Sequence, residues 1–391
     1  MIRYLTAGES HGPALVGILD GLPAGMEVDV EAIQREMTAR QGGHGRGGRM
    51  KIESDTVEFV AGLRGGLTLG SPLALLVRNR DFENVRGLMD PLTGSGPPIT
   101  RPRPGHADYA GALKYRHRDL RNVLERASAR ETAMRVALGA VARQYLALFG
   151  TEVVGFVRQI GDVASQLEIE MADLVATAQS PVRCPDAEAS ARMVARIDRA
   201  KTEGDTLGGV FELRATGMPV GIGSNRQPLE RLDARLAASL TSIQTVKAVE
   251  FGSGISSADF IGSRSHDTFE RRGEEIGRGS NRAGGIEGGM SNGEAIVVRV
   301  KVKPIATLMR PLASVDLESG AEAPAAVVRS DVCAVPAASV IGEAMLCLAL
   351  AEAFSDKYGG DSVEEVREHF EASQAGAARI FGRKKPASTT S

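Results

Sequence analysis

The sequence predicts an α+β fold in which antiparallel sheets are covered by helices. Strand-like and helix-like segments are interleaved along the chain, and the strand-like segments alternate apolar with polar residues. This alternation is typical of sheets with one solvated face and argues against a fully buried parallel sheet. A length of 391 residues by itself favours two or three domains, but no Pro/Ser-rich linker or long charge run divides the chain. We therefore expect one domain over residues 1–381 and a disordered tail over residues 382–391.

The predicted strands are short and, in the N-terminal part, separated by glycine turns. The N-terminal strands cover residues 2–6, 14–19, 50–60 and 73–77. Later strands are predicted over residues 152–159, 208–215 and 295–302. Their alternating pattern leaves one face of each sheet for the helices to cover.

The clearest predicted helix follows Ser128 and ends at Gly150. Ser128 and Glu131 match the S-x-x-E capping box, in which each side chain accepts from the other residue's backbone N–H. The apolar stripe of this helix consists of Met134, Leu138, Val141, Tyr145 and Leu148. Because a helix N-terminus favours anions, Arg126, Ser128 and Arg130 should present a surface suited to phosphate.

An earlier helix is predicted over residues 30–41, with Asp29 as its N-cap and the Gly42–Gly43 pair as its stop. Further helices are predicted over residues 186–201, 228–243, 337–354 and 362–380. The apolar positions of the last two are expected to be core residues.

The composition is that of an ordinary soluble enzyme, with 42% hydrophobic and 25% charged residues. Aromatic residues are scarce at 4%, and tryptophan is absent, which argues against a stacking surface for nucleic acid. The first seven residues do not resemble a signal peptide, and no uninterrupted apolar run reaches the ~18 residues of a membrane helix. We expect a protein without nucleic-acid or membrane partners.

The three cysteines are too few and too widely spaced for a disulfide framework. Cys184, Cys333 and Cys347 form no CxxC pair and no metal-ligand spacing. An odd, sparse set of cysteines is typical of a reducing cytoplasm. We therefore expect a cytoplasmic protein without a metal site.

Residues 101–131 carry the densest positive charge in a chain whose formal net charge is only -2. They contain eight Lys/Arg against four Asp/Glu, with two histidines, His106 and His117. Positive charge beside titratable imidazoles indicates a pocket for a small polyanion on which proton chemistry is done. The alternative is a solvated basic face.

Three further segments have the character of ligand-binding loops. Residues 37–51 combine four basic residues with five glycines and contain no acid, so backbone N–H groups and guanidinium groups can approach phosphate or carboxylate oxygens. Residues 281–293 contain five glycines, and residues 303–307 (KPIAT) follow a predicted strand. Segments of this kind spread along the chain indicate one composite site.

Two motif matches do not fit their structural context. Residues 8–12 (GESHG) match the nucleophile elbow G-x-S-x-G, but Pro13 and another strand follow where a helix is needed. Residues 43–48 match G-x-G-x-x-G, but a helix precedes them and a strand follows, which reverses the order of the dinucleotide-binding fold. Neither a serine hydrolase nor a Rossmann fold is predicted.

Taken in order, the motifs resemble those of the chorismate synthase family, from residue 1 to about residue 355. The matching segments are GESHG at 8–12, the Arg/Gly loop at 40–49, RPGHADYAGALKY at 103–115, RASARETA at 126–133, GGIEGGMSNG at 284–293, KPIAT at 303–307 and RSD at 329–331. Each motif alone is weak, whereas seven in the family's order make an accidental likeness very improbable.

The resemblance implies a single-domain β-α-β sandwich and a homotetramer. It also implies a carbon–oxygen lyase acting on phosphates, the last enzyme of the shikimate pathway that leads to the aromatic amino acids. The substrate of that family is 5-enolpyruvylshikimate-3-phosphate, which loses phosphate and a ring hydrogen in an anti-1,4 elimination that gives chorismate. The family requires reduced FMN, and some members use NADPH to reduce it.

The resemblance also implies roles for individual residues. His106 matches the histidine that protonates the departing phosphate, His11 the one that protonates the reduced flavin, and Asp331 the acid that assists removal of the ring proton. The implied FMN-binding residues are Arg126, Ala127, Ser128, Gln244, Thr245, Gly288, Lys303, Pro304, Ile305, Ala306, Thr307 and Arg329. The implied substrate- or NADP-binding residues are Ser10, Arg40, Arg46, Arg49 and Arg130. Many relatives have histidine where this chain has Ser330.

Alternatives remain at both levels. For the whole chain they are a flavin-dependent oxidoreductase acting on a small anionic substrate and a non-catalytic binder of polyanions or RNA. For Asp331 the alternative is an ion pair with a neighbouring arginine. His44 is either a site residue or a histidine that the glycine loop merely exposes. His117, His266 and His369 are expected to be structural or surface residues.

Overall fold

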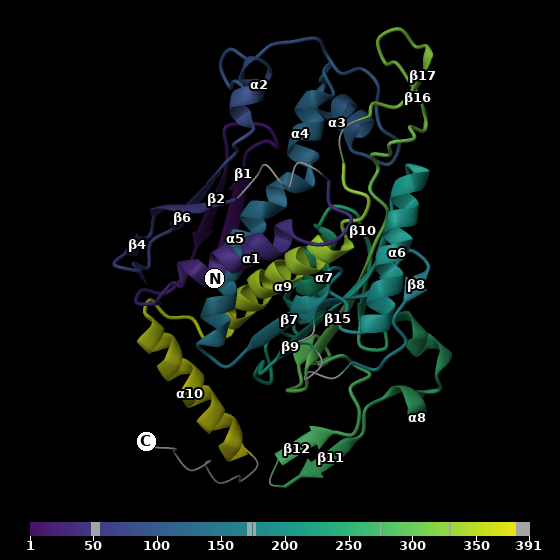
Figure 1. Ribbon diagram of the computed structural model, residues 1–391. Coiled ribbons are helices and arrows are strands. Elements are labelled where there is room, and N and C mark those ends of the chain that lie inside the picture. The colour runs from purple at the N-terminus through teal and green to yellow at the C-terminus, as the bar shows by residue number, and fades with distance from the viewer. Residues whose placement is uncertain (48–54, 170–173, 175–176, 274, 328–329, 381–391) are drawn as a thin grey trace.

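Helices α5 (Thr132–Ala147) and α9 (Val335–Lys357) form the middle of the molecule, with a sheet on either side (Figure 1). The computed structural model describes residues 1–47, 55–169, 174, 177–273, 275–327 and 330–380. One sheet packs against α5 and the other against α9. The predicted α+β class and the β-α-β sandwich are both confirmed.

Both large sheets are antiparallel throughout. The first has the order β1 (Arg3–Ala7), β2 (Ala14–Asp20), β6 (Leu73–Arg78) and β3 (Val57–Ala61). The second has the order β10 (Val246–Phe251), β15 (Ile296–Val302), β9 (Gly209–Thr216), β7 (Glu152–Ile160) and β8 (Val163–Ala164). The alternation read from the sequence agrees with the first sheet, which has one covered face. The second sheet also buries Phe156 and Glu212 on its face away from α9.

The remaining elements surround this sandwich. Longer helices are α1 (Val30–Gln41), α6 (Ala187–Glu203), α7 (Leu232–Thr241) and α10 (Val363–Ile380). Short helices are α2 (Phe82–Met89), α3 (Asp108–Tyr115), α4 (Arg121–Ala127), α8 (Gly262–Ser265), η2 (Ala129–Glu131), η4 (Pro228–Glu230) and η5 (Gly254–Asp259). Hairpins pair β4 (Leu63–Arg64) with β5 (Leu67–Thr68), β11 (Phe269–Arg272) with β12 (Glu275–Arg278), β13 (Ile286–Glu287) with β14 (Met290–Ser291), and β16 (Ala313–Val315) with β17 (Glu322–Pro324).

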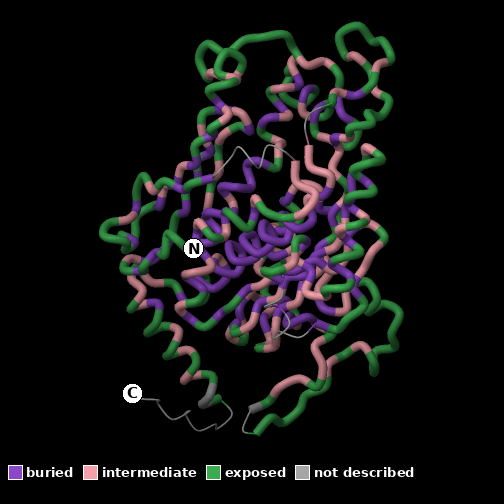
Figure 2. Tube along the Cα trace, in the orientation of Figure 1, coloured by how far each residue is buried: buried purple, intermediate pink, exposed green. Residues whose placement is uncertain are grey.

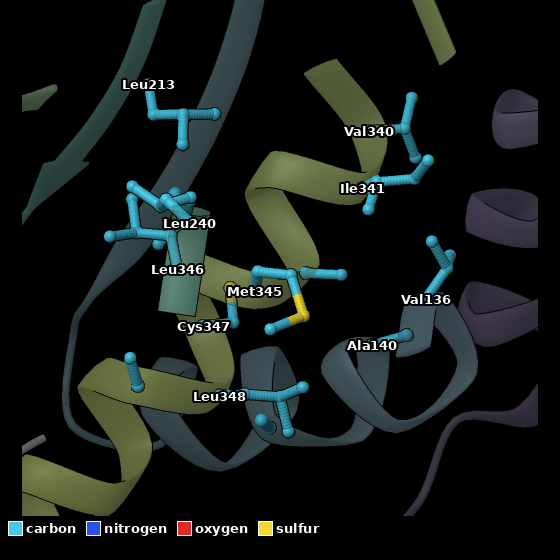
Figure 3. Close-up of a cluster of buried hydrophobic side chains, with 14 of the residues drawn as sticks. Val136, Ala140, Leu213, Leu240, Val340, Ile341, Met345, Leu346, Cys347 and Leu348 are labelled. Carbon is cyan, nitrogen blue, oxygen red and sulfur yellow. The ribbon is translucent and has the colours of Figure 1, made fainter. Parts of the chain in front are cut away.

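The core follows the two central helices, and the loops at both ends of the molecule are exposed (Figure 2). Figure 3 shows Leu213 of β9 on one side of α9 and Val136 and Ala140 of α5 on the other. Helix α9 is long and apolar enough to cross a membrane, with a mean hydropathy of 1.7, but 94% of that window is buried inside the protein. Burial of the helix on all sides explains its composition, since it packs between protein layers.

A buried glutamate, Glu343, connects α9 to α5 and to the second sheet inside this apolar core. Glu343 of α9 pairs with Arg143 of α5 at 2.8 Å and with Arg183 at 2.5 Å. It also accepts the backbone N–H of Gly155 in β7 at 2.7 Å. A buried carboxylate is tolerated only when its oxygens are satisfied in this way.

Most predicted elements are confirmed, with boundaries within a few residues. Asp29 caps α1 as predicted and accepts the backbone N–H of Ala32. The predicted strand over residues 50–60 is β3, which begins at Val57, and residues 50–54 lie outside the described residues.

Two local predictions are wrong. The helix predicted over residues 228–243 is divided, because Arg231 adopts an extended backbone between η4 and α7. The capping box is not formed, because the Glu131 carboxylate binds Arg135 and Gln244 instead of turning back to Ser128. A long-range contact lies at each position: Leu232 N donates to Gly289 O, and Gln244 donates to Glu131, although Arg135 is only four residues from Glu131.

The crossing of α5 and α9 requires glycine at one position. A Cβ placed on Gly139 of α5 would lie 2.4 Å from Ala344 Cβ and 2.6 Å from Ala344 Cα. These distances are below any normal contact, and the obstacle is the backbone of α9. The absence of a side chain at Gly139 therefore sets how closely the two central helices approach.

We expect Gly139→Ala to destabilise the protein by about 1–3 kcal/mol, because the methyl group overpacks the helix crossing. In an open helix the same change usually stabilises by roughly 0.5–1 kcal/mol. Gly376→Ala in α10, where nothing lies within 4 Å of the new Cβ, is the matched control. Denaturant unfolding of both variants measures the difference, and equal effects would contradict the assigned role of Gly139.

Candidate active site

The turn between β1 and β2 packs against the junction of α4 and η2. The backbone N–H of Ser10 donates to Glu125 O at 3.1 Å, and Ser128 Oγ donates to Ser10 Oγ at 3.2 Å. Arg126 donates to Thr6 O at 3.0 Å. These contacts bring three of the predicted site residues to one place, with Ala127 between two of them.

His11 lies in the same turn and is held by a buried carboxylate. Glu125 is 5% exposed, and its Oε1 lies 2.9 Å from His11 Nδ1. Its Oε2 accepts the backbone N–H of His11 at 2.7 Å. Since a carboxylate that accepts from the ring fixes the orientation of the imidazole, His11 is positioned before any ligand binds.

His106 is held in a similar way. Its Nδ1 lies 2.5 Å from Oδ1 of Asp108, the first residue of α3. Asp108 also accepts from Arg103 Nε at 2.9 Å, and both side chains of this ion pair are buried. The second predicted catalytic histidine therefore also sits on a buried carboxylate.

The segment after β15 packs against the loop that carries His106. Lys303 Nζ donates to Gly105 O at 2.5 Å, and Arg103 Nη1 donates to Thr307 Oγ1 at 2.9 Å. The backbone N–H of Lys303 donates to Thr245 O at 2.9 Å. Residues 303–307, which include Pro304, Ile305 and Ala306, thus lie beside both Thr245 and the His106 loop.

Gln244 and Thr245 have the features of a binding segment. Gln244 Nε2 donates to Glu131 Oε1 at 2.7 Å, which fixes the amide orientation. Its Oε1 is buried, and no atom in the described part of the chain donates to it. Thr245 has a left-handed φ of 74°, a strained backbone that often marks a functional site. An acceptor oriented in this way fits a ring N–H such as that of a flavin.

Two buried arginines share one carboxylate beside these segments. Asp55 lies 2.5 Å from Arg130 Nη1 and 3.8 Å from Arg40 Nη1, and the three residues are 1%, 6% and 4% exposed. Arg130 also donates to Asn79 Oδ1 at 2.8 Å. Burial, followed by the charge of Arg46, lowers the pKa of Arg40 to about 10, so this guanidinium stays charged at neutral pH. Two cations against one anion leave a positive potential suited to an anionic ligand.

Asp331 forms the ion pair that the sequence left as an alternative to a catalytic role. Its Oδ2 lies 2.6 Å from Arg46 Nη1, and its Oδ1 accepts the backbone N–H of Gly47 at 2.6 Å. The ion pair does not exclude a catalytic role, because these contacts with the Arg/Gly loop hold the Asp331 carboxylate in a fixed position. The predicted residues Arg49 and Arg329 lie outside the described residues.

Gly288 lies away from the other predicted residues within one chain. Its hairpin, β13–β14, packs at the start of α7, where Gly289 O accepts from Leu232 N at 2.8 Å. Gln244 follows the opposite end of α7, and Lys303 follows the far end of β15. A seven-residue strand such as β15 spans about 23 Å. Of the four ligand-like segments, three converge, and residues 281–293 do not join them.

Sequence reasoning missed the residues that hold the predicted ones. They are Asp55, Asn79, Arg103, Asp108 and Glu125. Of these residues, Asp108 is the one that the sequence could best have indicated, because it lies two residues after His106 at the start of a helix. Asp55 and Asn79 carry no motif, and only the fold brings them to Arg130.

The remaining histidines lie elsewhere. His44 Nε2 lies 2.7 Å from Asp198 Oδ1 on α6, at the surface. His117 and His369 are exposed, and His266 lies in the loop after α8. The pairing with Asp198 favours a structural part for His44, although its loop also carries Arg46.

Comparisons with known proteins agree with this arrangement. A family model described as chorismate synthase matches residues 2–355. The chain is 55% identical over 388 residues to a chorismate synthase from Symbiobacterium thermophilum, covering 94% of this chain and 97% of that protein. It is 56% identical over 376 residues to one from Desulforudis audaxviator, covering 94% and 95%.

A solved structure of a chorismate synthase superposes with a TM-score of 0.77 at 40% identity, covering 96% of this chain and 98% of that one. Sequence and fold therefore agree over nearly the whole length. The chain belongs to the chorismate synthase family, lyases of the shikimate pathway.

Proposed function

We propose that this chain converts 5-enolpyruvylshikimate-3-phosphate to chorismate and phosphate with reduced FMN, using the residues gathered between α3, α4 and η2. The observation that carries the proposal is that a buried carboxylate holds each of two histidines, while two buried arginines share Asp55. A substrate with one phosphate and two carboxylates needs several fixed cations, and a proton must be delivered as phosphate leaves.

Arg40, Arg46 and Arg130 bind the anionic groups of the substrate, together with Arg49 and Ser10. Arg40 and Arg130 are buried and already oriented by Asp55, so little side-chain entropy is lost when an anion binds. Arg40 Nη1 makes no hydrogen bond within the described ranges, although it is buried. That nitrogen lies 3.8 Å from Asp55 Oδ2, and its N–H groups can donate to an oxygen of a bound anion.

His106 donates a proton to the departing phosphate, and His11 supplies a proton on the flavin side of the site. An imidazole suits both tasks because its ordinary pKa lies near neutrality. Asp331, fixed by Arg46 and Gly47, assists in removing the ring proton. The three groups come from the β1–β2 turn, the loop before α3 and the segment before α9.

The FMN site is formed by Arg126, Ala127, Ser128, Gln244, Thr245 and residues 303–307, and the family motif also assigns Arg329 to it. Gln244 Oε1 accepts a ring N–H, and the Lys303 ammonium adds positive charge for an anionic group of the cofactor. When bound, reduced FMN supplies electron density to the substrate as phosphate leaves. The electrons that reduce FMN come either from NADPH bound by this chain or from an external reductant.

We further propose a homotetramer, in the cytoplasm. The outer face of the first sheet is apolar and exposed: Leu5 is 73% exposed and is paired across the strands with Ile18. The hairpin β11–β12 exposes Phe269 to 70%. Association would cover these surfaces. The three buried free thiols agree with a reducing compartment.

The proposed reaction predicts product only with reduced flavin. In an anaerobic assay with chemically reduced FMN, chorismate absorbance and phosphate should appear in equal amounts without net flavin oxidation. Oxidised FMN is the control, and adding NADPH to it tests whether the chain reduces its own flavin. Net oxidation of the flavin would indicate the flavin-dependent oxidoreductase instead, and absence of flavin binding would contradict both enzymes.

His106→Ala should lower kcat by about 10²–10⁴-fold, because a positioned general acid contributes that much. Affinity for FMN should change little, because the His106 imidazole is bound to Asp108 of α3, which is not one of the proposed FMN-binding residues. His369→Ala on α10, an exposed histidine bound to Gly359 O, is the matched control. A kcat for His106→Ala equal to that of the control would remove His106 from the mechanism.

The tetramer predicts a solution mass of roughly four chains of 41.2 kDa, measured by light scattering. Ile18→Lys should lower that mass, because a charge would be placed in an apolar interface. A monomeric wild-type protein would contradict the proposal.

A further inference from the structure

Asp108 has an unusual number of contacts for one carboxylate. It is 1% exposed, and its Oδ2 accepts from the backbone N of Arg103 at 3.1 Å and from Arg103 Nε at 2.9 Å. Its Oδ1 accepts from Arg103 Nη2 at 3.1 Å and lies 2.5 Å from His106 Nδ1. Arg103 therefore donates to both carboxylate oxygens of Asp108, and Oδ1 also contacts the His106 imidazole.

We propose that Asp108 is the positioning residue for His106: it holds the proton on Nδ1 and leaves Nε2 as the nitrogen that gives its proton to the substrate. The proposal rests on the proposed role of His106 as the acid of the reaction. In this role Asp108 sets which nitrogen of the His106 ring keeps its hydrogen, and it does not contact the substrate.

The chemistry of the pair fixes the tautomer. An ionised carboxylate can only accept hydrogen bonds, so a nitrogen 2.5 Å from Asp108 Oδ1 must carry hydrogen. Burial opposes ionisation of Asp108, but hydrogen bonds from His106 and Arg103 prevail and hold the pKa of Asp108 well below its usual range. Nδ1 is therefore protonated whether the ring is neutral or charged, and only the proton on Nε2 comes and goes.

Two positive groups also lie near His106 in the described part of the chain. Arg103 Nη2 lies 3.0 Å from Nδ1 and 3.3 Å from Nε2 of the ring. Lys303 Nζ is bound to Gly105 O, the carbonyl next to His106 in the chain. Without Asp108 these two cations would disfavour an imidazolium. The negative charge of Asp108 offsets these two cations beside the ring.

Arg103 also connects this pair to the segment that binds FMN. Its Nη1 donates to Thr307 Oγ1 at 2.9 Å, while Nε and Nη2 hold Asp108. The orientation of His106 is thus linked through one side chain to residues 303–307. A purely structural alternative is that Asp108 serves only to anchor Arg103 and to start α3, where an acid in the first turn is favourable.

Asp108→Asn separates these alternatives, because it keeps the size of the side chain and removes its charge. We expect kcat at neutral pH to fall about 10- to 100-fold, with KM and FMN affinity changed less than about threefold. A rate that needs the imidazolium falls as pH rises. In the variant that fall should begin at lower pH than in the wild-type protein, since the negative charge beside the imidazole is removed. Part of the activity should therefore return in acid.

Glu212→Gln is the matched control for a structural effect. Glu212 of β9 is a fully buried carboxylate that pairs with Arg158, Arg214 and Arg299 on the face of the second sheet away from α9. Its substitution should lower Tm without moving the pH profile. If Asp108→Asn lowers Tm but leaves the pH profile unchanged, as expected for Glu212→Gln, the positioning role is wrong.

A second measurement does not depend on any variant folding. ¹⁵N imidazole spectra of the wild-type protein, with His106 assigned by its absence from His106→Ala, report the protonation of each ring nitrogen. Hydrogen on Nδ1 of the neutral ring supports the proposal, and the Nε2–H tautomer would overturn it. If His106→Ala keeps full activity, the proposed role of His106 fails, yet the spectra still decide whether Asp108 sets the tautomer.

Discussion

The close crossing of α5 and α9 is the constraint on which the rest of the structure depends. Each sheet covers one of these helices, and Gly139 allows the two backbones to approach until Ala344 touches α5. Glu343 then links α9 to Arg143 of α5 and to the backbone of β7. A wider crossing would separate both sheets and would leave this carboxylate without its partners in the core.

The site lies where the segments before these two helices meet. Ser128 and Arg130 precede α5, and Asp331 precedes α9, so the distance between the helices also sets the distance between these residues. Arg40 joins them from the end of α1. Binding groups placed on segments anchored to a rigid core keep their geometry before a ligand arrives, which reduces the cost of ordering them.

Buried acids organise the basic residues of the site. Asp55 holds two arginines, Asp108 holds Arg103 and His106, and Glu125 holds His11. Each acid removes part of the repulsion between neighbouring cations and fixes a side chain that would otherwise be flexible. The candidate anion site therefore contains carboxylates as well as guanidinium groups, and the density of positive charge in the sequence reports only part of this arrangement.

The sequence by itself determined the fold class, most helices and strands and the family, because periodicity, caps such as Asp29 and glycine-rich motifs are local signals. Only the tertiary structure decided which residues meet. Asp55 and Asn79 reach Arg130 from distant strands and loops, and Glu131 leaves its predicted cap for Arg135 and Gln244. It also decided that Gly288 lies a strand's length from the segments it was expected to join. Contacts between residues far apart in the chain depend on how whole elements pack, and no local pattern encodes that packing.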